Sequence, residues 1–514
     1  MKNIPVFTAI FMLTALGSSA QTTTAMLRMQ ESKTTINKNI YGHFAEHLGH
    51  CIYDGIYVGD TNRIVPNTAG VRNDIIVALR KLKVPVLRWP GGCFADTYHW
   101  KDGVGPKKKR PSMVNKWWGG VTEDNSFGTH DFLNFCTQIG ADPYLAGNVG
   151  SGTVQELSQW VEYVNGSGIS PMSSWRKANG RDKPWDVKYF GVGNEAWGCG
   201  GNMTPEYYSN IYKQYATFMT GGGNSQLFRV ASGANGDDYH WTEVMMRDIP
   251  QNMIEGVSLH YYSVIDWNAK GPGAEFSRLQ YFSTLKQALR MEELILKHEA
   301  IMDKYDPGKK TALVVDEWGG WYDVEKGTNP SFLFQQNTMR DAVLAGVTLN
   351  IFNNHCDRVR MANLAQIVNV LQSVILTNKQ KIILTPTYHV MEMYNVHQDA
   401  VMIPVTLQNV FYIEGKDSLP AISVSASRDQ LGVVHISLVN IDPGKTNPVR
   451  IQGIVPGMKL ESAKILRSDR IQDHNSFDDP EKIIPRKFLQ AVMKEGDLQV
   501  DMPPASVVLI TLHE

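Results

Sequence analysis

The feature that most constrains this chain is an alternation of short apolar runs with longer stretches of helical periodicity, from about residue 37 to 390. Eight strand-then-helix units predict a parallel sheet, and eight parallel strands are the number that closes a (β/α)8 barrel. Several runs are apolar throughout, as expected of strands covered on both faces. The candidate strands are residues 39–44, 84–89, 143–147, 187–193, 227–232, 256–262, 312–316 and 348–353.

Beyond residue 390 the pattern changes to strands without intervening helices. Stretches such as AISVSAS, GVVHISLVNI and SVVLITLH alternate or are rich in β-branched residues, and turn residues separate them. They predict an all-β, jelly-roll-like sandwich over residues 391–514. A strand-like segment near the start of the chain, within residues 21–36, is expected to join it. The predicted fold class is therefore α/β, with a (β/α)8 TIM barrel over residues 37–390 and an accessory sandwich.

The first 20 residues have the pattern of a secretory signal peptide. Lys2 supplies a positive charge, residues 4–16 are mostly apolar, and Ser18, Ser19 and Ala20 are small enough for a cleavage site. The apolar run is too short to cross a membrane, and no later run is long enough. We expect an exported protein, periplasmic or extracellular, without a membrane partner.

Composition excludes some classes of function. Lys and Arg number 50 against 51 Asp and Glu, which argues against a nucleic-acid binder. An odd number of cysteines cannot pair completely, and these contain no C-x-x-C motif, so buried thiols are expected in place of a disulfide framework. The five are Cys51, Cys93, Cys136, Cys199 and Cys356.

His43, Glu46 and His47 spell H-x-x-E-H, the inverted signature of zinc peptidases. Such a site needs both histidines on a helix of several turns and a third ligand further along the chain. Gly42 and Gly49 bracket the motif, and glycine disfavours a helix. We therefore favour a strand end and loop, which would place Glu46 at the mouth of the barrel, where substrates bind. A metallopeptidase remains the alternative.

Two glutamates follow predicted barrel strands. The fourth strand runs into Asn194 and Glu195, and the seventh into Asp316 and Glu317, and each glutamate is followed by an aromatic residue and glycines. Paired carboxylates across a barrel mouth suit glycosidic bond cleavage, in which one donates a proton and the other stays ionised. The fourth and seventh strands can bring them to roughly 5 Å, the separation used by retaining enzymes.

Motifs along the whole chain resemble those of the α-L-arabinofuranosidases of glycoside hydrolase family 51. The resemblance implies an exo-acting retaining hydrolase that removes terminal non-reducing α-L-arabinofuranosyl residues from arabinan, arabinoxylan or arabino-oligosaccharides. It implies no metal or other cofactor, and a homo-oligomer, often a hexamer. The matching stretches are YGHFAEHLGHCIYDGI, LRWPGGCFADTYHWKDGVGP, NSFGTHDF, YFGVGNEAWGCGG, SLHYY, DEWGGWYD and MANLAQIVNVLQSVILT.

The resemblance also assigns roles to the residues around the two carboxylates. Glu195 resembles the general acid/base and Glu317 the nucleophile of the family. Asn194 is similar to the residue that holds the sugar 2-hydroxyl, Tyr262 to a tyrosine that orients the nucleophile, and Arg88 to an arginine that favours its ionised form.

Three further residues are assigned to sugar binding by the same resemblance. Glu46 is similar to a glutamate that clamps distal hydroxyls of the furanose, and Gln366 to a glutamine that reaches the sugar. Cys93 corresponds to a residue that lines the sugar subsite.

Two other classes of function remain open. A retaining endo-glucanase or β-xylosidase could use the same barrel, and an endo-enzyme would have a long open cleft in place of a closed pocket. A non-catalytic carbohydrate-binding protein would be expected to lack one of the two glutamates, and both are present.

Overall fold

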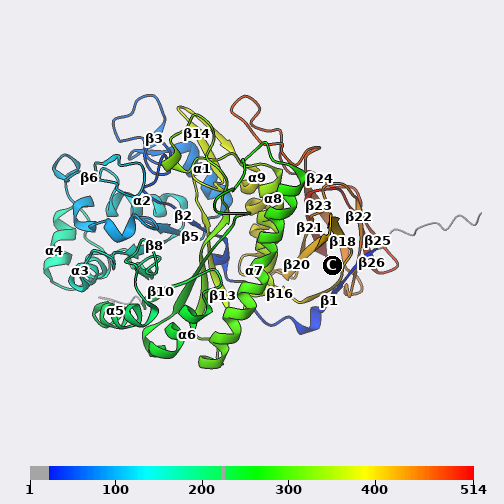
Figure 1. Ribbon diagram of the computed structural model, residues 1–514, viewed down its shortest axis with the longest axis horizontal. Coiled ribbons are helices and arrows are strands. Elements are labelled where there is room, and N and C mark those ends of the chain that lie inside the picture. The colour runs from blue at the N-terminus through cyan, green and yellow to red at the C-terminus, as the bar shows by residue number, and fades with distance from the viewer. Residues whose placement is uncertain (1–21, 221–225) are drawn as a thin grey trace, which may run out of the picture.

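The computed structural model describes residues 22–220 and 226–514, so the predicted signal peptide lies outside the described residues. Eight parallel strands close into a barrel in the order β10-β11-β12-β13-β2-β5-β8-β9 (Figure 1). The predicted TIM barrel is therefore confirmed. Its strands are β2 Gly42–Phe44, β5 Val86–Trp89, β8 Asp142–Gly147, β9 Tyr189–Val192, β10 Phe228–Asn235, β11 Gly256–Ser263, β12 Ala312–Gly320 and β13 Val359–Ala365.

Helices surround the barrel (Figure 1). Several of these helices have side-chain caps at their N-termini. For example, Ser277 and Gln280 form a capping box at the start of the longest helix. The helices are α1 Asn73–Leu82, α2 Thr129–Ile139, α3 Val154–Asn165, α4 Pro171–Ala178, α5 Pro205–Phe218, α6 Tyr239–Asp248, α7 Arg278–Tyr305, α8 Met339–Asn354 and α9 Pro386–Tyr394. Two-stranded ribbons in the connecting loops are β3 Asn67–Thr68 with β4 Val71–Arg72, β6 Met113–Val114 with β7 Thr122–Glu123, and β14 Ile375–Asn378 with β15 Lys381–Leu384.

The prediction that residues 348–353 form the eighth strand is wrong. These residues belong to helix α8, and the eighth strand is β13. The reason is burial on all sides, because α8 lies between the barrel and the C-terminal sheets, where Asn350 and Asn353 hydrogen-bond Ser423 and Ser425 at 3.1 Å each. A helix that is buried all round shows little amphipathic period, and part of it reads as a buried strand.

The C-terminal part consists of two sheets with the orders β17-β1-β22-β26-β25 and β16-β20-β21-β27-β23-β24, which confirms the predicted all-β domain. The first strand of the chain, β1, pairs in parallel with β22 and antiparallel with β17. The strands are β1 Thr23–Leu27, β16 Val401–Ile403, β17 Val405–Gln408, β20 Ile422–Arg428, β21 Val434–Asn440, β22 Asn447–Gln452, β23 Lys459–Leu466, β24 Arg486–Lys487, β25 Ala491–Lys494, β26 Asp497–Met502 and β27 Ser506–His513; a separate ribbon joins β18 Phe411–Glu414 to β19 Asp417–Pro420.

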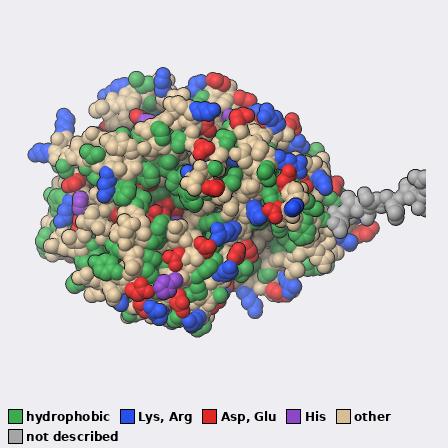
Figure 2. Space-filling model, in the orientation of Figure 1, with side chains coloured by type: hydrophobic (Ala, Val, Ile, Leu, Met, Phe, Trp, Pro, Cys, Tyr) green, Lys and Arg blue, Asp and Glu red, His purple; other side chains and the backbone are tan. Residues whose placement is uncertain are grey.

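The first barrel strand is shorter than expected, because residues 38–41 form a turn of 3-10 helix before β2 begins at Gly42. A Cβ at Gly42 would lie 2.4 Å from Asn363 Oδ1 of the neighbouring strand, so only glycine allows this close approach. Acidic and basic side chains are interspersed over the face shown in Figure 2. Among residues 22–220 and 226–514, no helix is long and apolar enough to span a membrane.

Candidate active site

A small cavity opens among the loops that follow the barrel strands. Its lining includes six of the eight residues selected from the sequence, namely Glu46, Cys93, Glu195, Tyr262, Glu317 and Gln366. The other two, Arg88 and Asn194, lie beside the carboxylates and hydrogen-bond each other at 2.5 Å. A larger hollow near the β14–β15 ribbon has one carboxylate in its described lining, so chemistry and not size identifies the site.

Glu195 and Glu317 face each other in this cavity. Glu317 lies within β12, and Glu195 follows β9 with a backbone φ of 41°, in the left-handed region. One carboxylate oxygen of each, and a ring nitrogen of His260, all lie within 4.8 Å of one another. Their side chains are 19% and 7% exposed, so both are accessible to a substrate while largely shielded from bulk water.

The surroundings of Glu317 favour its ionised form. Arg88 Nη1 donates to Oε1 at 2.9 Å, and the Tyr262 hydroxyl donates to Oε2 at 2.7 Å. Burial raises the pKa of Glu317, but the charges of His260 and Arg88 and the hydroxyl of Tyr262 lower it more, so that its pKa lies below the ordinary value. These contacts therefore stabilise the ionised carboxylate of Glu317.

Replacing Tyr262 with phenylalanine is expected to shift the acidic limb of the kcat/KM profile to higher pH and to lower kcat about ten-fold. The substitution removes one hydrogen bond to the ionised carboxylate, so the depressed pKa of Glu317 rises and the carboxylate is lost earlier as pH falls. The profile should be measured on an aryl glycoside that the enzyme cleaves, with Tyr261→Phe as the matched control, because the Tyr261 hydroxyl bonds Gln287 instead. An unchanged acidic limb would contradict this role for Tyr262.

His260 is a site residue that the sequence analysis missed. Its Nδ1 lies 3.0 Å from Glu195 Oε1 and 3.6 Å from Glu317 Oε1. Burial lowers the pKa of His260, but the two carboxylates outweigh burial and hold its pKa above the ordinary value. A signal was present in the sequence, because His260 and Tyr262 are two apart on one strand and therefore project from the same face.

Glu46 has three donors around its carboxyl group. The Phe94 amide and Trp118 Nε1 donate to Oε1 at 3.1 and 2.9 Å, and Gln366 Nε2 donates to Oε2 at 3.0 Å. Burial and the nearby Glu317 nevertheless raise the pKa of Glu46 to about 7. Near neutral pH this group can accept or donate a hydrogen bond, which suits recognition of a hydroxyl.

The pair of glycines in RWPGG leaves room for the carboxylates. A Cβ at Gly91 would lie 2.5 Å from Glu46 Cγ, and a Cβ at Gly92 would lie 2.9 Å from Glu317 Oε1. Real side chains do not approach so closely, so this loop must consist of glycine for both acids to point into the cavity.

Asp96 ties together the loops that support the site, and the sequence analysis missed it. Its carboxylate accepts hydrogen bonds from the amides of Val149 and Gly150 at 2.8 and 2.7 Å, and from that of Asn194 at 3.0 Å. Burial raises the pKa of Asp96 to about 7, although these donors oppose the rise. Asp96 thus fixes the backbone next to Glu195.

Two tryptophans complete the cavity wall, and neither was selected from the sequence. Trp118 donates to Glu46, and Trp321 packs edge-on against Tyr262 with ring centroids 5.0 Å apart. Trp321 directly follows β12, in the motif DEWGGWYD. Trp118 lies in a loop between β6 and β7, where no sequence period marks it.

The histidines of the H-x-x-E-H motif do not form a metal site. His43 is buried within β2, whereas His47 lies in the following loop, 2.8 Å from Glu123 and accepting from Trp89 Nε1 at 3.0 Å. Within the described residues, the clusters with metal-ligand spacing are Cys93–Glu195–Cys199 and Glu195–His260–Glu317, and neither contains these histidines. The motif is therefore a strand end and loop, as favoured from its glycines.

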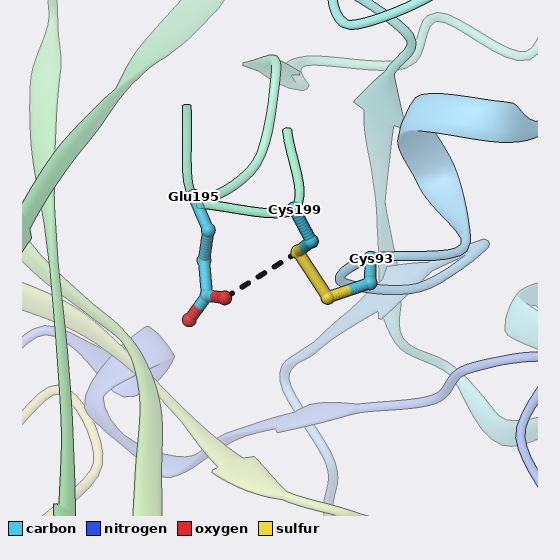
Figure 3. Close-up of side chains that lie close together, drawn as sticks. All are labelled: Cys93, Glu195 and Cys199. Atoms are coloured by element: carbon cyan, nitrogen blue, oxygen red, sulfur yellow. Dashed lines mark hydrogen bonds between the residues drawn. A yellow bond between two sulfur atoms is a disulfide. The ribbon is translucent and has the colours of Figure 1, made fainter. Parts of the chain in front are cut away.

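The expectation of unpaired thiols is wrong for two of the five cysteines. Cys93 and Cys199 form a disulfide across the cavity edge (Figure 3), whereas Cys51, Cys136 and Cys356 are free and buried. The two partners are 106 positions apart, on the loops after β5 and β9, so the sequence gives no sign that they meet.

Comparison with known proteins decides the family. Models named "Alpha-L-arabinofuranosidase 1 domain" and "Alpha-L-arabinofuranosidase C-terminal domain" match residues 78–271 and 316–506. A Bacteroides ovatus protein named "Intracellular exo-alpha-L-arabinofuranosidase" is 47% identical over 516 residues, which cover 100% of both chains. The chain belongs to the α-L-arabinofuranosidases of glycoside hydrolase family 51. The predicted family and the class of enzyme are confirmed, and the endo-glucanase, β-xylosidase, binding-protein and peptidase alternatives are not favoured.

Solved structures of the family agree with this assignment. The family 51 arabinofuranosidase from Xanthomonas axonopodis pv. citri shares 45% identity, with a TM-score of 0.94 and coverage of 96% of this chain and 100% of that one. An arabinose complex of the Thermotoga maritima enzyme shares 29% identity, with a TM-score of 0.83 and coverage of 95% and 99%. Arabinose-containing glycans are thus the class of substrate.

The prediction of export is contradicted. The Bacteroides ovatus relative, which aligns over the whole of both chains, is named an intracellular enzyme. The prediction depended on one short apolar run near the N-terminus, and such runs occur in many structural contexts.

Proposed function

We propose that this arabinofuranosidase removes single terminal non-reducing α-L-arabinofuranosyl residues by a two-step retaining mechanism. Glu317 attacks the anomeric carbon while Glu195 protonates the departing oxygen, and a covalent glycosyl-enzyme forms. Glu195 then takes a proton from water, which releases arabinose. The observation that carries this proposal is the approach of the two carboxylates within 4.8 Å. Inverting enzymes hold their carboxylates about 6.5–9.5 Å apart to admit a water molecule, whereas retaining enzymes hold them at about 5 Å.

The charges around the cavity support the division of roles. Arg88 and Tyr262 both bond Glu317 and neither bonds Glu195, which favours Glu317 as the ionised nucleophile. His260 contacts both carboxyl groups, so it can stabilise a negative charge on either of them during the reaction. Asn194, held by Arg88, is proposed to bind the 2-hydroxyl of the sugar.

The size of the cavity supports exo-action on one furanose. Glu46, with Trp118 and Gln366, would clamp the hydroxyls far from the scissile bond, and Cys93 would line the same subsite. Arabinan, arabinoxylan and arabino-oligosaccharides all carry such ends. The name of the Bacteroides ovatus relative supports action inside the cell. Assembly as a homo-oligomer, with a hexamer expected, stays a prediction that light scattering tests.

A substrate panel combined with NMR of the first product tests the mechanism. We expect aryl α-L-arabinofuranoside to be cleaved at least about 100-fold faster than the matching β-xyloside and β-glucoside, because a small pocket discriminates against larger rings. The first sugar detected should keep the α configuration. Initial release of the β anomer, or cutting within a debranched arabinan chain, would overturn the proposal.

A further inference from the structure

The Cys93–Cys199 disulfide lies directly against the proposed general acid. Cys93 lines the cavity, and Cys199 Sγ is 3.5 Å from Glu195 Oε2 (Figure 3). All three residues are half-buried, whereas the other three cysteines are buried. A small dithiol that enters the substrate pocket can therefore reach this disulfide but not the remaining sulfur atoms.

The oxidation state of Cys199 decides which form of Glu195 its sulfur favours. A sulfur in a disulfide has no hydrogen and can only accept, so it pairs with the protonated carboxyl group, whose O–H can donate. A thiol can donate its hydrogen to a carboxylate, and a hydrogen bond to the charged form favours that form. Reduction therefore changes the direction of the interaction at the atom that must supply the proton.

The other titratable groups that face Glu195 or its neighbour Glu317 come from β5, β11 and β12. His260, from β11, contacts the second oxygen, Oε1, at 3.0 Å. Glu317, from β12, lies within 4.8 Å, with Arg88 from β5 and Tyr262 from β11 bonded to it. The neighbouring carboxylates disfavour a second negative charge, so that reduced Cys199 stays a thiol.

We propose that the Cys93–Cys199 disulfide is a redox-sensitive element that controls the proton of Glu195, so that the oxidised enzyme keeps its general acid to higher pH than the reduced enzyme. The inference rests on the proposed role of Glu195. A dithiol supplies two electrons and two protons; the bond between the two Sγ atoms breaks, two S–H bonds form, and the dithiol closes to its own disulfide. In a reducing compartment, disulfides that persist are mostly catalytic or redox-sensing, which fits a reversible element.

The test compares pH profiles of kcat/KM before and after treatment with dithiothreitol. Alkylation after unfolding should count three thiols in the oxidised protein and five in the reduced one, since the chain has five cysteines and three are free. On reduction, the alkaline limb should move down by about half a pH unit, or roughly three-fold in rate at a fixed pH above it. The acidic limb should stay in place, and saturating arabinose should slow the reduction.

Two variants separate the hydrogen bond from the loss of the cross-link. Both Cys93→Ser and Cys199→Ala lack the disulfide, but only the first leaves an S–H facing Glu195. Cys93→Ser should therefore keep the alkaline limb of the reduced enzyme. Cys199→Ala has neither the donor nor the acceptor sulfur, so its alkaline limb should lie at higher pH than that of Cys93→Ser, and neither variant should respond to dithiothreitol. Cys356→Ala should respond like the parent protein.

The outcomes distinguish this inference from the mechanism on which it rests. The inference alone would be overturned if the alkaline limbs of kcat/KM were identical in the two variants. It would also be overturned if the thiol count rose from three to five while the alkaline limb of the parent protein did not move. An alkaline limb that persists in Glu195→Gln would overturn the assignment of Glu195 as the general acid.

Discussion

Replacing Glu317 with alanine is expected to lower kcat on an aryl α-L-arabinofuranoside by roughly four to six orders of magnitude, as for removal of other enzymatic nucleophiles. Without this carboxylate no covalent intermediate can form, and Arg88 and His260 lose the negative charge that they face. Added azide should enter the vacated space and yield an arabinosyl azide of inverted configuration. Activity is measured by release of the phenol, and the azide product by NMR.

The matched control for this variant is Glu275→Ala, which removes an exposed glutamate in the loop before α7 and should leave kcat unchanged. Thermal unfolding of both variants should show that the fold is retained. A Glu317→Ala enzyme within ten-fold of the parent protein would refute the assignment of the nucleophile.

Replacing Glu195 with alanine should produce a loss that depends on the leaving group. General acid catalysis contributes about 10² to 10⁴-fold, so poor leaving groups such as sugars should lose about that factor. A dinitrophenolate needs no proton to depart, and its first-step rate should fall little. The alkaline limb of kcat/KM should disappear, because the group that must be protonated is gone.

Azide gives a second readout for the same variant. It should attack the glycosyl-enzyme from the side that Glu195 occupied and give a product of retained configuration, opposite to that of Glu317→Ala. The isosteric Glu195→Gln should show the same dependence on the leaving group. Equal losses for sugar and dinitrophenyl leaving groups would show that Glu195 is not the proton donor.

Much of the fold was predictable from the sequence, and the exception has a physical cause. Seven of the eight predicted barrel strands overlap observed ones, because buried parallel strands are short and apolar and turn residues bound them. The eighth was misassigned because α8 is covered by the barrel on one side and by β20 and β21 on the other. Periodicity reveals a helix only when one of its faces meets water.

The part of the candidate site that could be predicted is the pair of glutamates, because the same local pattern, a strand followed by a glutamate, occurs twice along the chain. Glu195 and Glu317 were selected because each follows a predicted strand, and strand ends are local features of a sequence; in the structure Glu195 follows β9, and Glu317 lies within β12. The Cys93–Cys199 pair and the bond from Trp118 to Glu46 were not found, because each depends on how two loops fold over the barrel mouth. His260 was overlooked beside Tyr262, although both lie on one face of β11.

The pairing of β1 with β17 and β22 has a consequence for synthesis on the ribosome. Leu27 ends β1, and its partner Val405 is translated 378 residues later (405 − 27). At about 5–20 residues per second, β1 waits roughly 20 to 75 seconds before β17 is made, and until then the backbone groups on both of its edges have no partner strand. Because an unpaired edge invites association with other chains, a holding chaperone that covers β1 during this delay should increase the yield of native enzyme.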